Sequence, residues 1–533
     1  GAANFAADVT FADGADIITA SAGTDNVRIG ATAGDSIQSG GNYNALFGTN
    51  AGTAITTGSF NTFLGVFSGD AIIDSNSNVA VGYSALSSDT KGAKSVAVGV
   101  STLLNQNFTT ATDTYNVAVG HNAGKAVTTG VFNTLIGALA GDALTVGGEN
   151  DVLGLGALTA DTKGSHTVAI GRGTLEAQNF TTATDVYNVA VGSFAGRNVT
   201  TGIKNIFIGG LAGDATTDAD ENVAIGYDSL GTNTVGSASV AVGASALRTQ
   251  NPSTATQMLN TAIGHFAGFA VTTATHNTLI GALAGDALTT GSSNVAVGYL
   301  ALSTDDVGQH NVAIGRQALE NLNIATAANV YNTAVGSTSG AALTTGTNNT
   351  LLGGQAGKSL TATEGNTAVG LNALLSDTNG SRTVAVGRSA LGVQNFTTAT
   401  DTYNVAVGYF AGVSVTTGVQ NTLIGGLAGS SLTTPNQNVA VGHGTLDAET
   451  AGARNTAIGT NSLTTQNVTT GGNVYNVGLG YFAGANITTG IQNTLIGSLA
   501  GDALTDADRN IAIGYQALTT DDLGSRTVAL GAG

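Results

Sequence analysis

The sequence predicts an all-β protein, a parallel β-solenoid in which short strands stack coil upon coil. Two observations support this. A motif Asn-x-x-aliphatic-Gly recurs at fixed spacing along nearly the whole chain, and it is rich in Val, Ile, Thr and Gly, which favour short strands and tight corners. The composition agrees, because 78 of 533 residues are Gly, only 2 are Pro and 42% are hydrophobic. Such an apolar chain can bury a core, which argues against disorder and against collagen.

The repeat has two levels. A 72-residue period begins near residues 43, 115, 187, 259, 331, 403 and 475, each time at a Tyr-Asn pair or, once, Leu-Asn. Within one period the motif glycines are Gly120, Gly137, Gly154 and Gly171, which predicts coils of 17, 17, 17 and 21 residues. Such strict spacing is typical of a repeat array in which each unit contacts mainly its neighbours.

These boundaries divide the chain into two segments. Residues 26–533 form the repetitive shaft, about 29 coils at one strand per coil. Residues 1–25 lie outside the register, and we interpret them as a non-repeat strand segment that ends a preceding domain. Because the chain begins without Met and stops at Gly533 in the middle of a coil, we expect it to be part of a longer protein.

Each coil begins with the Asn position. Asn116, Asn133 and Asn150 are successive members of this column, and in stacked coils their amides would lie about 4.8 Å apart. At that distance they can form a hydrogen-bonded ladder, and Asn also tolerates the conformations of a corner. We therefore interpret this column as structural rather than as a ligand groove.

The strand and its closing glycine follow. Side chains alternate along a strand, so Val117 and Val119 point to one face and Ala118 to the other. Because the residue before the glycine is almost always aliphatic, we expect it to line the interior. Gly120 then turns the chain, which a residue without Cβ does at no steric cost.

Three residues after the glycine, the side chain is always small. Ala123, Ala140 and Ala157 belong to this column, which predicts close approach of another layer. The next position alternates between Gly124 and bulky residues such as Leu158, so the cross-section differs from coil to coil.

The fourth coil of each period is longer by four residues, which predicts one surface bulge per period. Phe108, Phe180 and Phe396 lie in these bulges beside Thr and Asp. Two interpretations remain open. Either the Phe side chains cap local apolar patches, or they are possible surface contacts that touch sugars or a partner protein.

Few residues of the sequence indicate a catalytic, metal or cofactor site. The chain has no Cys, and its formal net charge of −18 disfavours nucleic acid and membrane as partners. The six His residues mostly occupy different columns, and Asp142 belongs to a column of presumed outward carboxylates that recurs only once per four coils. We therefore predict no catalytic residue, no metal site, no cofactor and no enzyme activity. Tailspike-like depolymerases with paired carboxylates are a remote alternative, although the array is never interrupted as such a site would require.

Three strings indicate a resemblance: HTVAIG at 166–171, NVAVGYFAG at 404–412 and NIAIGYQAL at 510–518. They resemble the head repeats of trimeric autotransporter adhesins and, more closely, the repeat arrays of phage tail-fibre proteins. The segment 1–25 resembles the strand pairs that precede such arrays in phage fibres. The resemblance implies a parallel, left-handed, homotrimeric β-roll used as a stalk or head that attaches to cells, with no catalytic residues.

A trimer is also expected on physical grounds. We expect Ala118, Leu135 and their equivalents to form an apolar stripe on the outside, larger than a monomer tolerates. A closed rotational assembly of identical copies would cover it. The sequence therefore predicts the structural shaft of an extracellular attachment fibre, of a phage tail or virion, whose partners are its own copies and a host-surface glycan or protein. A bacterial surface adhesin stalk is the alternative.

Overall fold

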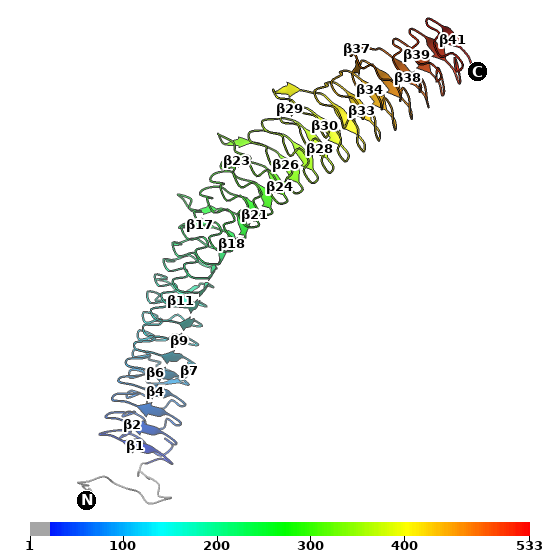
Figure 1. Cartoon of the computed structure of the whole chain (residues 1–533). Helices are drawn as coiled ribbons and strands as arrows, with labels where there is room; N and C mark the ends of the chain where they lie inside the picture. Colours follow the sequence, from blue (N-terminus) through cyan, green and yellow to red (C-terminus); the bar gives the residue numbers. More distant parts are fainter. Residues whose placement is uncertain (1–21) are drawn as a thin grey trace, which may run out of the picture. The chain divides into compact units, whose positions relative to one another are not determined.

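The computed structural model describes residues 22–533, and every regular element in this range is a β-strand. The strands stack in parallel as a β-solenoid, so the predicted fold class is confirmed (Figure 1). Most of the predicted segment 1–25 lies outside the described residues. The chain divides into two compact units, one that reaches to Ser245 and adds Asn251–Gln257, and one made of Ala246–Gln250 and Met258–Gly533.

Each coil contributes one three-residue strand, here called a main strand, and the two units together contribute 29 of them. The main strands of the first unit are β1 (Val27–Ile29), β2 (Ala45–Phe47), β3 (Thr62–Leu64), β4 (Val79–Val81), β6 (Val96–Val98), β8 (Val117–Val119), β9 (Thr134–Ile136), β10 (Asp151–Leu153), β12 (Val168–Ile170), β14 (Val189–Val191), β15 (Ile206–Ile208), β16 (Val223–Ile225) and β18 (Val240–Val242). Those of the second unit are β20 (Thr261–Ile263), β21 (Thr278–Ile280), β22 (Val295–Val297), β24 (Val312–Ile314), β26 (Thr333–Val335), β27 (Thr350–Leu352), β28 (Thr367–Val369), β30 (Val384–Val386), β32 (Val405–Val407), β33 (Thr422–Ile424), β34 (Val439–Val441), β36 (Thr456–Ile458), β38 (Val477–Leu479), β39 (Thr494–Ile496), β40 (Ile511–Ile513) and β41 (Val528–Leu530).

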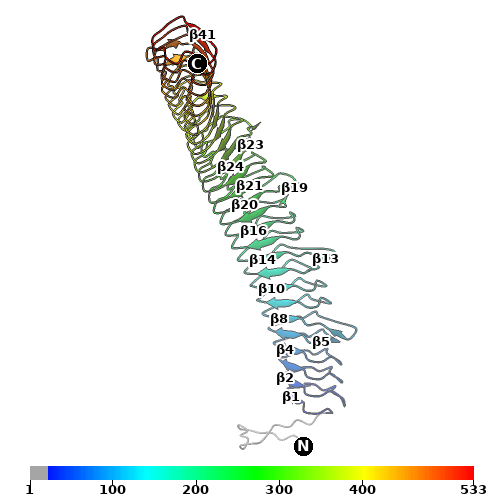
Figure 2. The ribbon, with the colours of Figure 1, turned by 90° about the vertical axis from the view of Figure 1, so that its right-hand side faces the viewer.

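Short two-residue strands pair on the opposite side of the coil from the main strands. Figure 2 shows β5, β13 and β19 on the side away from β4, β8 and β14. These parallel pairs are β5 (Gly92–Ala93) with β7 (Thr112–Asp113), β11 (Gly164–Ser165) with β13 (Thr184–Asp185), β17 (Gly236–Ser237) with β19 (Thr256–Gln257), β23 (Gly308–Gln309) with β25 (Ala328–Asn329), β29 (Gly380–Ser381) with β31 (Thr400–Asp401), and β35 (Gly452–Ala453) with β37 (Gly472–Asn473).

Neighbouring main strands pair in parallel, so that equivalent residues stack. Thr134 of β9 lies between Val117 of β8 and Asp151 of β10. More residues separate the paired positions of β12 and β14, where Val168 pairs with Val189, than those of β8 and β9, where Val117 pairs with Thr134. The second strand of each short pair lies in this longer connection, as β13 does between β12 and β14.

The interior is lined by the middle residue of each main strand, which corrects our assignment of faces. Ala118 is fully buried, whereas Val117 and Val119 are only half-buried. Leu135 is likewise buried, and Ile136, the residue before the glycine, is half-exposed. Side chains alternate as expected, but in a three-residue strand only the middle one points inward.

The interior is filled by large residues that alternate between two places in the coil. Where the middle strand residue is large, as at Leu135, the position four residues after the motif glycine is Gly141, and a Cβ there would lie 3.0 Å from Leu135 Cδ2. Some coils with a small strand residue, such as the coil of Ala169, carry the buried Leu175 at this position. Others, such as the coil of Ala118, carry Gly124, where a Cβ would lie 2.6 Å from Leu135 Cδ1 of the next coil. The sequence alternation between Gly and Leu therefore keeps the interior close-packed.

Three corners of each coil adopt the left-handed conformation. In one coil these residues are Tyr115, Asn122 and Gly124, with φ of 50°, 58° and 58°. This conformation disfavours residues with a Cβ. Neighbouring coils offset the cost by hydrogen bonds, since Asn122 N donates to Val100 O at 3.0 Å.

Candidate functional site

The Asn column forms a buried ladder that ties each coil to the next. Asn133 N donates to Asn116 Oδ1 at 2.9 Å, and Asn150 N donates to Asn133 Oδ1 at 3.1 Å. Asn133 Nδ2 also donates to the corner carbonyl of Gly147 at 3.0 Å. Because all three Asn side chains are fully buried, these amides satisfy backbone groups that water cannot reach.

The motif glycines are required by both backbone conformation and space. Gly120, Gly137, Gly154 and Gly171 have φ between 133° and 149°, where side chains are strongly disfavoured. A Cβ on Gly120 would also lie 2.5 Å from the carbonyl oxygen of Gly137 in the next coil. Each of these glycines therefore lets two coils approach closely.

The small-residue column lies inside the solenoid. Ala123, Ala140 and Ala157 are fully buried. Ala140 also belongs to the backbone network between coils, because its carbonyl accepts from Gly124 N at 2.9 Å. The column also contains the buried Thr102 and Thr174, so it admits a small β-branched side chain. We expect a side chain as large as Leu to displace a neighbouring layer.

A buried Asp–Gln network spans each of several long coils, and our sequence analysis missed it. Gln178 Nε2 donates to Asp161 Oδ2 at 2.7 Å and to Thr167 Oγ1 at 3.2 Å, while Gln178 Oε1 accepts from Asn188 Nδ2 at 2.9 Å. Asp161 Oδ1 accepts from the backbone of Gly164 and Phe180. The network replaces the Asn ladder where Thr167 interrupts it. Equivalent networks join Asp89 to Gln106, Asp377 to Gln394 and Glu449 to Gln466.

Two periods depart from this pattern: in one, Asn233 replaces the acidic residue, and in the other, the acidic Asp305 remains but the Gln is lost. Leu322 takes the place of the Gln, and the ladder residue is Asn311, whose Nδ2 lies 3.5 Å from Asp305 Oδ2. Burial raises the pKa of Asp305, and the backbone donors of Ile324 and Gly308 only partly oppose this. The side-chain amide nearest to Asp305 Oδ2 therefore lies 3.5 Å away, whereas Asp161 Oδ2 accepts a 2.7 Å hydrogen bond from Gln178.

The long-coil Phe residues are buried, which corrects the interpretation that they are exposed contacts. Phe108 is 7% exposed, and Phe180 and Phe396 are as deeply buried. The backbone N–H of Phe108 donates to Asp89 Oδ1 at 3.2 Å. These residues therefore anchor the long coils, which favours the apolar-cap interpretation.

Exposed aromatic rings instead stand just before the Asn ladder. Tyr115 is 47% exposed, and its hydroxyl accepts from Lys94 Nζ at 2.8 Å. Lys94 Nζ also donates to Asp113 at 2.7 Å, which raises the pKa of Lys94. The same arrangement recurs where Arg454 donates to the Tyr475 hydroxyl at 2.6 Å. These rings offer repeated, immobilised contact points on the surface.

Apolar side chains also remain on the outer face of the main strands. We define the outer stripe as the first and third residues of each main strand and the residue after each motif glycine. Leu153 is 47% and Leu155 is 54% exposed. Other exposed members in the first unit are Ile29, Leu64, Val66, Tyr83, Val100, Ile208 and Tyr227, and in the second Ile263, Tyr299, Ile314, Leu371, Tyr409, Ile424, Leu479, Tyr481, Ile511, Ile513, Tyr515, Val528 and Leu530.

A metal site would require a suitable arrangement of the titratable side chains of residues 22–533. No group of three or more His, Asp or Glu residues there could hold a metal ion. Asp142 is half-buried rather than outward, and burial raises its pKa. The same cause raises the pKa of Asp70 and Asp286 in the equivalent coils. Over the same range, no helix is long and apolar enough to cross a membrane.

Comparison of the sequence with models of known protein families and with curated proteins found no match. The functional argument therefore depends on the geometry of the solenoid itself.

Proposed function

We propose that this chain is the structural shaft of an extracellular attachment fibre, in which three parallel copies of a left-handed solenoid associate along their length. The outer stripe is the observation that carries the proposal. A soluble monomer usually exposes no apolar patch larger than a few hundred Å², whereas exposed apolar side chains of the outer stripe recur in many coils of each unit. Identical stripes on three copies would cover one another in a closed rotational assembly.

The arrangement of the long coils supports the same assembly. The short strand pairs lie on the side of the coil opposite the main strands (Figure 2). If the outer stripes meet at the centre of a trimer, the long coils stay at the periphery. A fibre of this kind would present repeated long-coil surfaces to a host-surface glycan or protein, while the buried ladders keep the shaft in register.

Sedimentation analysis of the full chain tests the assembly. We expect a species of three times the 52.2 kDa chain mass. Replacing Leu64, Leu153 and Ile208 together by Lys should dissociate it, because their side chains are 37–50% exposed on the outer stripe. Lys substitutions at the exposed long-coil residues Thr110 and Thr182 are the matched control. A monomer in the unaltered chain, or a trimer that tolerates the three stripe changes, would contradict the proposal.

Two alternatives are separated by other measurements. The complete coding sequence distinguishes a phage or virion fibre, which would carry a virion-docking module or folding chaperone, from a bacterial adhesin with a membrane-anchoring domain. Incubation with capsular polysaccharide, followed by an assay for new reducing or unsaturated ends, tests the depolymerase alternative. New ends would replace the structural proposal with an enzymatic one.

A further inference from the structure

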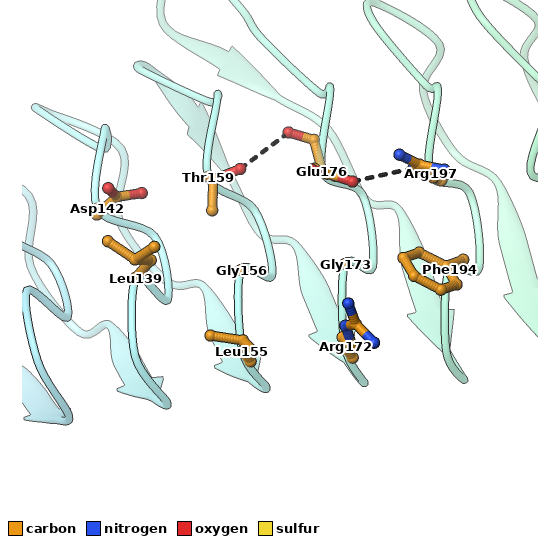
Figure 3. Close-up of a pocket in the computed structure, with 10 residues that line it drawn as sticks. All are labelled: Leu139, Asp142, Leu155, Gly156, Thr159, Arg172, Gly173, Glu176, Phe194 and Arg197. Carbon is orange, nitrogen blue, oxygen red and sulfur yellow. Dashed lines mark hydrogen bonds and ion pairs between the residues drawn. The ribbon is translucent and has the colours of Figure 1, made fainter.

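An open notch of about 460 Å³ interrupts the regular corner of the first unit (Figure 3). Gly156 and Gly173 form its floor, and Leu139 and Phe194 stand at its two ends. Its volume falls within the range of roughly 300–1,000 Å³ that is typical of small-molecule sites.

Glycines at the same position in two successive coils, Gly156 and Gly173, create the notch. They occupy the position two residues after the motif glycine, where the neighbouring coils carry Leu139 and Phe194. A Cβ on Gly156 would meet only Thr159 Cγ2, at 3.8 Å, so packing does not require a glycine there. A Cβ on Gly173 would lie 2.8 Å from Phe194 Cδ1, so this glycine lets the Phe ring lean over the notch.

The notch contains one cation without a carboxylate partner. Arg172 is exposed, its guanidinium carbon lies 5.4 Å from the Phe194 ring centre, and no ion pair in the described part of the chain involves it. Arg197, on the other side of the Phe194 ring at 5.1 Å, pairs with Glu176 at 3.0 Å. The stacking therefore orients the Arg172 guanidinium while leaving its donors available.

The remaining lining combines apolar and polar groups. Leu139 and Leu155 are exposed at the notch, and Thr159, Asp142 and Glu176 line its other side. An aliphatic surface beside hydroxyl and carboxylate groups suits the C–H face and hydroxyls of a sugar ring. Glu176 disfavours ligands that carry two negative charges, whereas the planar fork of Arg172 fits one carboxylate.

We propose that the notch binds one carboxylate-bearing pyranose residue of an acidic polysaccharide, with Arg172 pairing with the carboxylate and Leu155 contacting the ring. All lining residues of the notch belong to a single chain. Because Leu155 and Arg172 follow motif glycines and so belong to the outer stripe, the ligand and a neighbouring copy in the proposed trimer would compete for this surface.

The chain supplies a matched control. Arg388 and Phe410 are the register equivalents of Arg172 and Phe194, and their guanidinium carbon and ring centre are 5.8 Å apart. Asn372 and Ser389 occupy the places of Gly156 and Gly173 there. This second site keeps the Arg–aromatic pair but not the glycine floor.

The experiment uses ligand-observed NMR titration of the full chain with methyl glucuronide, with methyl glucoside as the neutral probe and glucose 6-phosphate, which carries nearly two negative charges at neutral pH, as a second anion. We expect methyl glucuronide to bind in preference to both. Arg172→Ala should weaken binding by at least about tenfold, the usual loss for a hydrogen bond to a charged group. Gly156→Leu should abolish binding by filling the notch, and it should fold because Leu139 has the same left-handed conformation, with φ of 59°. Arg388→Ala should bind like the unaltered chain.

Four outcomes would overturn the proposal: no binding of methyl glucuronide, equal binding of the neutral probe, equal binding of the phosphate, or undiminished binding by Arg172→Ala. Circular dichroism and sedimentation of each variant exclude misfolding as the cause of a loss. If Arg172→Ala or Gly156→Leu instead dissociates an assembly, the notch is a contact between copies and the ligand proposal is wrong.

Discussion

Replacing Gln178 by Leu tests whether the buried Asp–Gln network stabilises the long coil. The change removes one hydrogen bond to the Asp161 carboxylate, one to Thr167 Oγ1 and one from Asn188 Nδ2. A bond to a charged group contributes about 1.5–3 kcal/mol and a neutral bond about 0.5–1.5 kcal/mol, so the expected loss is about 2.5–6 kcal/mol of local stability. The apolar surface of Leu offsets a small part of this loss.

Hydrogen exchange measured by mass spectrometry is the suitable assay, because a long repeat array can open locally without unfolding. The amides of Gly164 and Phe180, which donate to Asp161 Oδ1, should exchange at least about tenfold faster in Gln178→Leu. The equivalent segment 377–404 of the same chain should exchange at its original rate.

A second change should partly restore protection. Thr167→Asn in the Gln178→Leu background reproduces the pair that the chain already uses at Asn311 and Leu322. The added amide can reach toward Asp161, as Asn311 does toward Asp305. Unchanged exchange in the single variant, or no recovery in the double variant, would refute the reasoning.

Three further predictions concern the interior and the coil corners. Gly120→Ala should lower the melting temperature, since its Cβ would lie 2.5 Å from the Gly137 oxygen; an unchanged melting curve would contradict the required close approach. Ala140→Leu should cost about 1–3 kcal/mol by overpacking, measured by denaturant unfolding of the full chain, and a change within error would mean that the column tolerates bulk. Asp305 has a raised pKa in the folded protein, so its ionisation should remove stability as pH rises from 3.8 through that raised pKa. Asp305→Asn should abolish that loss, whereas equal melting shifts with pH in both proteins would refute the assignment.

The solenoid could be predicted because its motif glycines never lose register, but the faces of the strand could not. Both faces of Val117–Val119 are apolar, so hydrophobicity does not identify the inner one. The available signal was size. The large Leu135 coincides with Gly141, and Leu175 accompanies the small Ala169, as expected of side chains that share one interior. Where Gly124 accompanies the small Ala118, Leu135 of the next coil occupies the space.

The functional surfaces were harder to predict, for a different reason. Phe108 looked like a contact residue because its segment is polar, yet its burial depends on the fold of the long coil around it. The Asp–Gln network did leave a signal, since Asp161, Gln178 and Asn188 recur with the same spacing in other periods and Thr167 interrupts the ladder where Gln178 appears. The sequence signature of the notch is only two glycines, Gly156 and Gly173, which are distant in sequence. They become neighbours once the coils are stacked.

The Asn ladder allows the array to gain or lose whole periods. The ladder and the network that replaces it at Thr167 recur once per period, so loss of Asn116–Tyr187, one complete period, would join Tyr115 to Asn188 without creating a new kind of contact. Gln106 would then occupy the place of Gln178 beside Asn188, and Asn205 would still donate to Asn188 Oδ1. Loss of a single 17-residue coil, residues 133–149, would also keep Asn in the ladder, because Asn150 would follow Asn116, but it would remove Leu135 from beside Gly124. Duplication or loss of whole periods in the gene can therefore lengthen or shorten this protein while leaving the packing of the remaining coils intact.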